Sequence, residues 1–226
     1  MLKKGLILAV SCLSLLSSVN VQAQDVYMRY SALYGKLKNN LKEGHDDVKI
    51  RLYLVDKAGQ TCHVHKASMR KDEHYEELTI PADYALSIPL DSNLRQANPD
   101  VTFVIDDGIT CDVSMQILAE NYQPKVLEQA YIEAIVPQMN TMMADLGGMF
   151  SQWFMPKAEG VVITLKDRTF NKTLALKTGK TLTFNSGVAR VHLNDLAENE
   201  SINLSKEIEK NFTVDPNQII NYRYIS

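Results

Sequence analysis

The sequence has 226 residues, with 24 lysines and arginines against 27 aspartates and glutamates, and a formal charge of −3. Its hydrophobic content of 45% and charged content of 23% are ordinary for a globular protein and exclude wholesale disorder. Ten glycines and seven prolines exclude a collagen-like or linker-dominated chain. Without an excess of basic residues, nucleic acid is not expected to be the main partner. The length suffices for one large domain or two small ones.

The first 23 residues have the pattern of a secretory signal peptide. Lys3 and Lys4 precede the apolar stretch Gly5–Leu16, and Val21-Gln22-Ala23 resembles a signal peptidase site. The apolar stretch is shorter than the roughly 20 residues of a membrane-spanning helix. Too few apolar residues precede Cys12 for a lipoprotein anchor. We therefore expect a periplasmic protein that is cleaved after Ala23 and has no transmembrane segment in the mature chain. Cleavage would leave 22 Lys and Arg against 27 Asp and Glu, a formal charge of −5.

Two cysteines then remain, Cys62 and Cys111, separated by 49 positions. In an oxidising compartment such a pair is expected to form one structural disulfide. Each cysteine follows a glycine turn, at Gly59 and at Gly108, which we interpret as the turn of a β-hairpin. A redox-active pair is the alternative, but the spacing differs from the C-x-x-C motif of such sites.

The part from residue 24 to residue 121 is predicted to form a disulfide-containing α+β domain. Leu33, Leu37 and Leu41 share one face of a helix expected within 27–43, with Ser31 as its N-cap and Gly44 at its end. The alternation of apolar residues predicts strands after it, and 93–100 is expected to be a polar turn. These strands are expected at 48–55, 62–69, 101–106 and 110–118, with short edge strands within 75–91.

The remaining chain is predicted as a helical segment at 122–157 and a β-rich part at 158–226. The helical stripe of Val126–Ile135 continues past Pro137, which is expected to kink or restart the helix. Apolar residues at period two then predict four short strands at 161–165, 173–177, 181–185 and 189–193. A short helix at 203–210 and a final turn or strand complete the chain. The predicted fold class is α+β: an N-terminal helix with antiparallel strands closed by a disulfide, a Met-rich helical segment, and a C-terminal antiparallel meander.

Several blocks between residues 27 and 118 resemble a family of exported Gram-negative bacterial proteins that carry a domain of unknown function. The blocks are Tyr30-Ser31, Lys36-Leu37-Lys38-Asn39-Asn40, Glu43-Gly44-His45-Asp46-Asp47-Val48-Lys49, His74-Tyr75-Glu76-Glu77-Leu78, Leu90-Asp91, Asn93-Leu94, Ala97-Asn98-Pro99, Cys111-Asp112 and Ser114-Met115. The resemblance favours a periplasmic location. It implies no activity and no catalytic residues.

The segment 135–155 is apolar and rich in methionine. Because methionine adapts to irregular partners, this segment is a candidate surface for an apolar ligand or an envelope protein. Burial in the core against a sheet and copper(I) binding by thioethers are the alternatives. The candidate residues are Met139, Met142, Met143, Met149, Phe150, Trp153 and Phe154.

Histidines give a second candidate site. His63 and His65 share one face of a predicted strand, where zinc could bind them together with His45. The alternative is a pair of solvated histidines. His45-Asp46 could also serve as a general base, or lie in a polar connection without a catalytic role.

No recognised catalytic or nucleotide-binding motif is present, including H-E-x-x-H, G-x-S-x-G and the P-loop. We therefore expect a non-enzymatic binding or envelope-associated module without a cofactor. The alternative is a metal-dependent or His/Asp-based hydrolase that uses the His45-Asp46 and His63–His65 region. A purely structural assembly role is a third interpretation.

Overall fold

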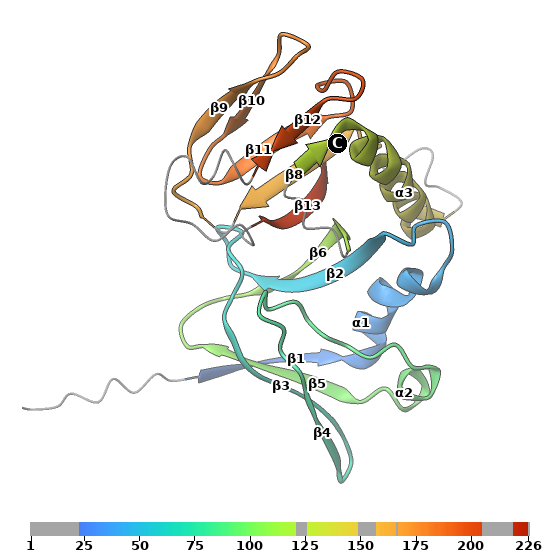
Figure 1. Ribbon diagram of the computed structural model, residues 1–226. Coiled ribbons are helices and arrows are strands. Elements are labelled where there is room, and N and C mark those ends of the chain that lie inside the picture. Colours follow the sequence, from blue (N-terminus) through green and yellow to red (C-terminus); the bar gives the residue numbers. More distant parts are fainter. Residues whose placement is uncertain (1–22, 121–125, 149–156, 166, 205–218, 226) are drawn as a thin grey trace, which may run out of the picture.

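The computed structural model describes residues 23–120, 126–148, 157–165, 167–204 and 219–225 (Figure 1). It contains few helices and many strands, and every strand pair is antiparallel, which confirms the α+β class. The elements in order are β1 (Ala23–Arg29), α1 (Tyr30–Leu37), the 3-10 helix η1 (Lys38–Leu41), β2 (Val48–Val55), β3 (Val64–Lys71), β4 (His74–Leu78), α2 (Ser92–Ala97), β5 (Asp100–Asp106), β6 (Asp112–Ala119), β7 (Val126–Glu128), α3 (Gln129–Gly147), β8 (Gly160–Leu165), β9 (Lys172–Ala175), β10 (Thr181–Phe184), β11 (Val188–His192), β12 (Ser201–Asn203) and β13 (Ile219–Ile225).

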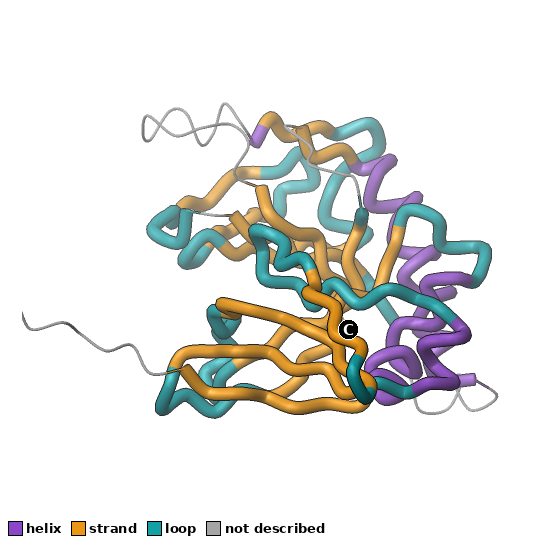
Figure 2. Tube along the Cα trace, turned by 90° about the horizontal axis from the view of Figure 1, so that it is seen from below, coloured by secondary structure: helices purple, strands orange, loops and turns teal. Residues whose placement is uncertain are grey.

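Two sheets form the main layers. One has four strands in the order β1-β5-β3-β4, and the other has five in the order β11-β8-β13-β6-β2. Helix α1 contacts strands of both sheets, while α3 packs on β2, β6 and β8 of the larger one. Figure 2 shows most of the helical trace along one side of the strands. The smaller pairs β9–β10 and β7–β12 flank these layers.

One continuous core joins the two sheets and the helices. It includes Tyr30 of α1, Phe103 of β5, Leu52 of β2 and Ile163 of β8, all at most 1% exposed. Strand β13 lies between β6 and β8, so strands from before and after residue 121 share a sheet. The boundary that the sequence suggests near residue 121 therefore does not coincide with a sheet edge.

The chain crosses between the sheets at the two glycine turns. The turn at Gly59 leads from β2 of the larger sheet to β3 of the smaller one, and the turn at Gly108 leads from β5 back to β6. The hairpin predicted at Gly59 is present only next to the turn, where Val55 bridges Thr61 and the Cys62 N–H donates to the Leu54 carbonyl. Beyond it the predicted pairing is wrong, because β2 pairs with β6 and β3 pairs with β5. The predicted disulfide is confirmed: Cys62 and Cys111 follow the two turns and are bonded to each other, with their Cα atoms 6.6 Å apart.

The helix predicted within 27–43 fills only part of that range, and it begins two residues before the position that Ser31 as N-cap would give. Residues 23–29 form β1, which pairs along its whole length with β5. Helix α1 then begins at Tyr30, whose N–H donates to the carbonyl of Pro99, while the N–H of Ser31 donates to Oδ1 of Asn98. The N–H groups at the start of the helix are thus hydrogen-bonded to residues about 70 positions away in the sequence. Ser31 is not the N-cap of this helix.

Residues 92–97 form a helix where the sequence suggested a polar turn. Asp91 caps α2, since its Oδ1 accepts from the N–H groups of Asn93 and Leu94. Asn98 ends the helix in the left-handed conformation, with φ 48°. The same Asn98 side chain caps α1, so the two helices are fastened to each other.

Helix α3 continues through Pro137 without a restart. Thr141 Oγ1 donates to the Pro137 carbonyl inside the helix. In the described part of the chain, no helix is both long enough and apolar enough to cross a membrane. The predicted helix at 203–210 lies almost wholly outside the described residues.

Because the disulfide ties the two sheet crossings, its removal should strongly destabilise the fold. The bond joins two residues that are 49 positions apart. For a loop of this length, the lost entropy of the unfolded chain stabilises the folded state by about 4 kcal/mol. We expect a Cys62→Ala, Cys111→Ala double variant to lose about that much free energy of unfolding in urea. Dithiothreitol should lower the stability of the wild-type protein similarly and leave the double variant unchanged. Equal stability of oxidised and reduced wild-type protein would contradict this role.

Candidate functional site

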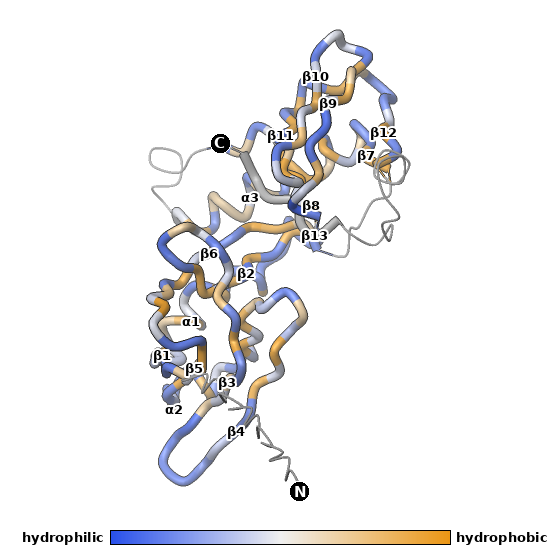
Figure 3. Tube along the Cα trace, turned by 90° about the vertical axis from the view of Figure 1, so that its left-hand side faces the viewer, coloured by the Kyte–Doolittle hydropathy of each residue, from blue (hydrophilic) through white to orange (hydrophobic). Residues whose placement is uncertain are grey.

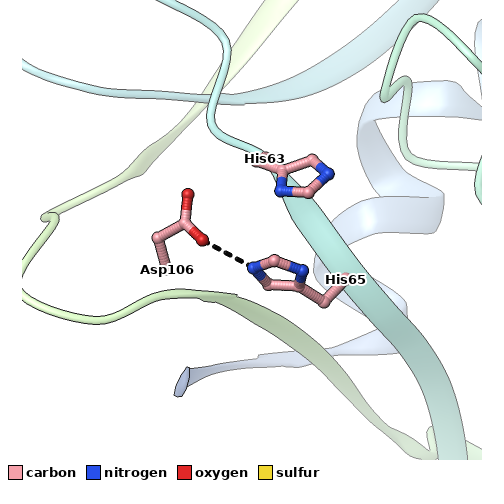
Figure 4. A group of neighbouring side chains, drawn as sticks. All are labelled: His63, His65 and Asp106. Carbon is pink, nitrogen blue, oxygen red and sulfur yellow. Dashed lines mark hydrogen bonds and ion pairs between the residues drawn. The ribbon is translucent and has the colours of Figure 1, made fainter. Parts of the chain in front are cut away.

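His63, His65 and Asp106 form a cluster at the end of the four-stranded sheet that lies next to the disulfide (Figure 4). His63 directly precedes β3, His65 lies in it, and Asp106 is the last residue of β5. One possible ligand atom from each residue lies within 4.8 Å of the others. His65 Nε2 is hydrogen-bonded to Asp106 Oδ1 at 2.6 Å. His63 and His65 are exposed residues, and the side chains of His65 and Asp106 are each about one-third exposed, at 34% and 36%.

A β-bulge orients His65 toward this cluster. In the register of β3 with β5, Val64 pairs with Ile105, but Lys66 pairs with Val104. His65 is therefore the extra residue of the bulge, and both His65 and Lys66 are exposed while Val64 and Ala67 remain buried. Bulges re-aim side chains in this way and are enriched near functional sites.

Tyr84 packs against the outer side of the cluster. Its ring meets the His63 ring edge-on at 4.8 Å, and the His63 and His65 rings lie 4.3 Å apart. Tyr84 adopts a left-handed conformation with φ 58°, which is unfavourable for a bulky residue. Such strain persists only where surrounding contacts impose it.

Asp83 supplies those contacts. One oxygen, Oδ2, accepts from Arg51 at 3.1 Å and from the Tyr53 hydroxyl at 3.2 Å, both on β2. The other Asp83 oxygen, Oδ1, accepts from the N–H of Ala85. Next to it, the N–H of Leu86 donates to the carbonyl of Leu52 and also holds this loop to β2. Burial and the adjacent Asp83 charge raise the pKa of Tyr53 above its ordinary value, so its phenol stays protonated as the donor.

The chemistry of the cluster suits a transition-metal ion. Two imidazoles and one carboxylate are a ligand set that zinc and related divalent ions accept. The ligand atoms would have to approach one another to meet metal–ligand bonds of about 2 Å. Exposed side chains can make such small movements without disturbing the core.

His45 does not join this cluster. Its side chain is fully buried, and its Nε2 lies 3.4 Å from Asp145 Oδ2 of α3, close enough for an ion pair but without hydrogen-bond geometry. Asp145 also accepts from Lys42 at 2.8 Å. Asp46, the predicted partner of His45, is exposed. The structure therefore separates His45 from the predicted metal ligands His63 and His65.

The Met-rich segment is core where the structure describes it. Met139, Met142 and Met143 of α3 are at most 2% exposed. They belong to the core, and α3 packs on β2, β6 and β8, so these three side chains are not part of an exposed binding surface. The other four candidates, Met149, Phe150, Trp153 and Phe154, lie outside the described residues.

Sequence reasoning missed Asp106 and Tyr84 as members of the site. Around Gly108 the sequence predicts only a turn, because nothing local indicates that β5 ends opposite His63 and His65. The signal that could have found Asp106 is its place as the last residue of an alternating strand close to Cys111. Nothing in the sequence around Tyr84 indicates its contact with His63.

Loss of Asp83 should release the loop that carries Tyr84. We expect Asp83→Ala to lower the free energy of unfolding by roughly 1–3 kcal/mol, because the buried Tyr53 hydroxyl and the Ala85 N–H lose their acceptor. The nuclear Overhauser contact between the Tyr84 and His63 rings should weaken in the same variant. Exposed Asp46→Ala is the matched control and should change neither. Equal stability of the two variants would show that Asp83 does not anchor this loop.

Comparison with known proteins places most of this structure within one family. A family model described as a protein of unknown function (DUF2987) matches residues 22–165, which is more than half of the chain and reaches β8. Arginine–tRNA ligases of Acinetobacter baumannii strains AYE and SDF are each 28% identical over 162 residues, covering 67% of this chain and 25% of the ligase. The chain thus spans about a quarter of the length of these relatives. No solved structure matches it. The chain belongs to the DUF2987 family of proteins of unknown function.

Proposed function

We propose that this protein is an exported, non-enzymatic binding protein that holds a transition-metal ion, such as Zn²⁺, at His63, His65 and Asp106. The observation that carries the proposal is the convergence within 4.8 Å of three possible ligand atoms, one from the end of β5, one from β3 and one from the residue before β3. The proposal keeps the binding module expected from the sequence. It replaces the apolar ligand with a metal ion, because Met139, Met142 and Met143 are buried.

Preorganisation supports metal binding at this place. His63 directly follows Cys62, whose position is fixed by the disulfide, and the bulge holds His65 beside Asp106. Tyr84 restricts the His63 ring from the other side. Ligands that are already held near their bound positions lose little freedom on binding, which favours affinity.

A metal-dependent hydrolase is the second candidate, and one observation favours it. Three protein ligands leave the fourth position of a tetrahedral zinc ion free for a water molecule, as in catalytic zinc sites. Binding is the better-supported function because both imidazoles are exposed on a sheet surface. Metal catalysis usually takes place in concave sites that exclude bulk water.

Export to the periplasm is part of the proposal. The charged, apolar and small-residue pattern of residues 1–23 supports it, as does the Cys62–Cys111 disulfide, because such bonds persist in oxidising compartments. Partners are accordingly proposed to lie in the cell envelope. Aminoacylation is not proposed, since the match spans only a quarter of the ligases.

The metal site predicts that one Zn²⁺ binds per chain and that its affinity depends on all three ligands. In calorimetric titrations of tag-free, chelator-treated protein at pH 7.5, we expect His63→Ala, His65→Ala and Asp106→Asn each to weaken binding at least tenfold. Binding should also weaken as the pH falls, because protons compete for the imidazoles. Exposed His192→Ala on β11 removes a histidine elsewhere and should leave the affinity unchanged.

Two outcomes would contradict the binding function. Unchanged zinc affinity in His65→Ala would place the ion elsewhere or show that none binds specifically. Zinc-dependent hydrolysis of p-nitrophenyl acetate that His65→Ala abolishes would instead favour the hydrolase.

The export proposal predicts the N-terminus of the mature protein. When the full chain is expressed in a Gram-negative host, we expect it in the periplasmic fraction, with Gln24 as its first residue by intact mass and N-terminal sequencing. An Ala23→Phe variant should slow this cleavage, because signal peptidase requires a small residue there. An unprocessed wild-type chain in the cytoplasmic fraction would contradict export.

A further inference from the structure

Strand β1 begins beside the histidine cluster. Strand β5 lies between β1 and β3, and Figure 3 shows these three strands side by side. In the register of β1 with β5, Ala23 lies directly opposite Asp106, and Gln24 lies opposite Ile105. The Cα atoms of directly opposed residues are about 4.5–5.5 Å apart, and their side chains share one face of the sheet. The junction between Ala23 and Gln24 is therefore next to a ligand of the proposed metal site.

The same junction is the expected cleavage site of the signal peptide. In the uncleaved chain, the nitrogen of Gln24 belongs to a peptide bond, where resonance withdraws its lone pair. Hydrolysis of this bond consumes one water molecule and leaves a carboxylate on Ala23 and a free α-amine on Gln24. The neutral amine is a nitrogen donor of the kind that zinc accepts. Because β1 pairs with β5 from Gln24 onward, this amine is held close to Asp106.

The charges around the junction attract both an amine and a metal ion. Asp25 lies on the same face of the sheet as Asp106, because side chains alternate along β1, and exposed Asp107 follows Asp106. Lys66 of β3 carries a positive charge on this part of the sheet. Its Nζ lies 4.0 Å from Oε2 of Glu77 on β4, on the side away from β1. The end of β1 is thus an acidic environment.

We propose that cleavage after Ala23 completes the metal site, in which the α-amine of Gln24 becomes the fourth ligand beside the histidine cluster. This inference rests on the proposed metal and export functions. Four protein ligands are typical of structural zinc sites, whereas catalytic sites keep one position open for water. A site closed in this way suits a binding protein and not a hydrolase. The uncleaved chain, with three ligands, would hold the ion more weakly until it is exported and processed.

Cyclisation of the terminal glutamine provides a matched test. Glutaminyl cyclase converts an N-terminal glutamine to pyroglutamate: the amine nitrogen bonds to the side-chain amide carbon, and ammonia leaves. The cyclised protein keeps its length and loses its free amine, which intact mass verifies. In calorimetric titrations of metal-free mature protein, we expect the cyclised form to bind Zn²⁺ at least about tenfold more weakly, since one of four bonds to the ion is lost. Arg29→Gln changes the charge at the far end of β1 and should leave the affinity unchanged.

Azide binding to the Co²⁺-loaded protein gives a second measurement. An open fourth position should bind azide and change the visible spectrum, and we expect this change in the cyclised form only. Urea unfolding of the two metal-free forms should coincide, because β1 keeps its pairing with β5 in both.

The results that would overturn this inference differ from those that would overturn the metal function. If both forms bind Zn²⁺ equally and His65→Ala weakens both, the metal function stands and the amine is not a ligand. Azide binding to both Co²⁺-loaded forms would likewise show that the fourth position stays open after cleavage. If neither form binds Zn²⁺, the metal function fails and this inference fails with it.

Discussion

The double crossing of the chain between two sheets, tied by the Cys62–Cys111 disulfide, is the constraint on which the rest of this structure depends. The chain crosses from β2 to β3 and later from β5 back to β6, and the disulfide joins these two crossings. As a result, β2 and β6 pair in one sheet, and β3 and β5 pair in the other. The residues nearest the crossings, His63 and Asp106, are thereby placed opposite each other at the end of the smaller sheet. The histidine cluster is thus a consequence of the crossing. Its geometry depends on an oxidised disulfide, which links the proposed metal site to an oxidising compartment.

Local strain accumulates around the same place. A bulge interrupts β3 at His65, and Tyr84 occupies a left-handed conformation that costs of order 1–3 kcal/mol. Both departures direct a side chain toward the cluster instead of toward the core. The Arg51, Tyr53 and Asp83 contacts hold the Tyr84 loop to β2 and offset the strain. A strand pair that serves only the fold needs neither the bulge nor the left-handed tyrosine. These two features therefore support the proposed binding role. They support it more strongly than the exposed His65–Asp106 pair does, because exposed ion pairs are common and contribute little stability.

The parts that the sequence predicted correctly are those set by neighbouring residues. The alternation of apolar and polar residues along β2 predicted that strand, and the two cysteines left after export predicted the disulfide. The failures all involve distant partners. The start of α1 is fixed by Asn98 and Pro99, so the helical spacing at 27–43 misplaced it. The glycine turns were recognised, but which sheet each following strand joins depends on pairing far along the chain. Likewise, His63 and His65 were found by their period-two spacing, whereas Asp106 reaches them only through the register of β3 with β5.

The rigidity of β3 determines what a bound metal ion would change. His65 lies in β3 and His63 directly precedes it, and β3 pairs on both sides, with β5 and with β4. A bound ion therefore cannot shift β3 without breaking the pairing of a sheet. Because the strand stays in place, an ion at His63, His65 and Asp106 would stabilise the folded chain by mass action, by an amount that grows with the logarithm of the ratio of ion concentration to dissociation constant.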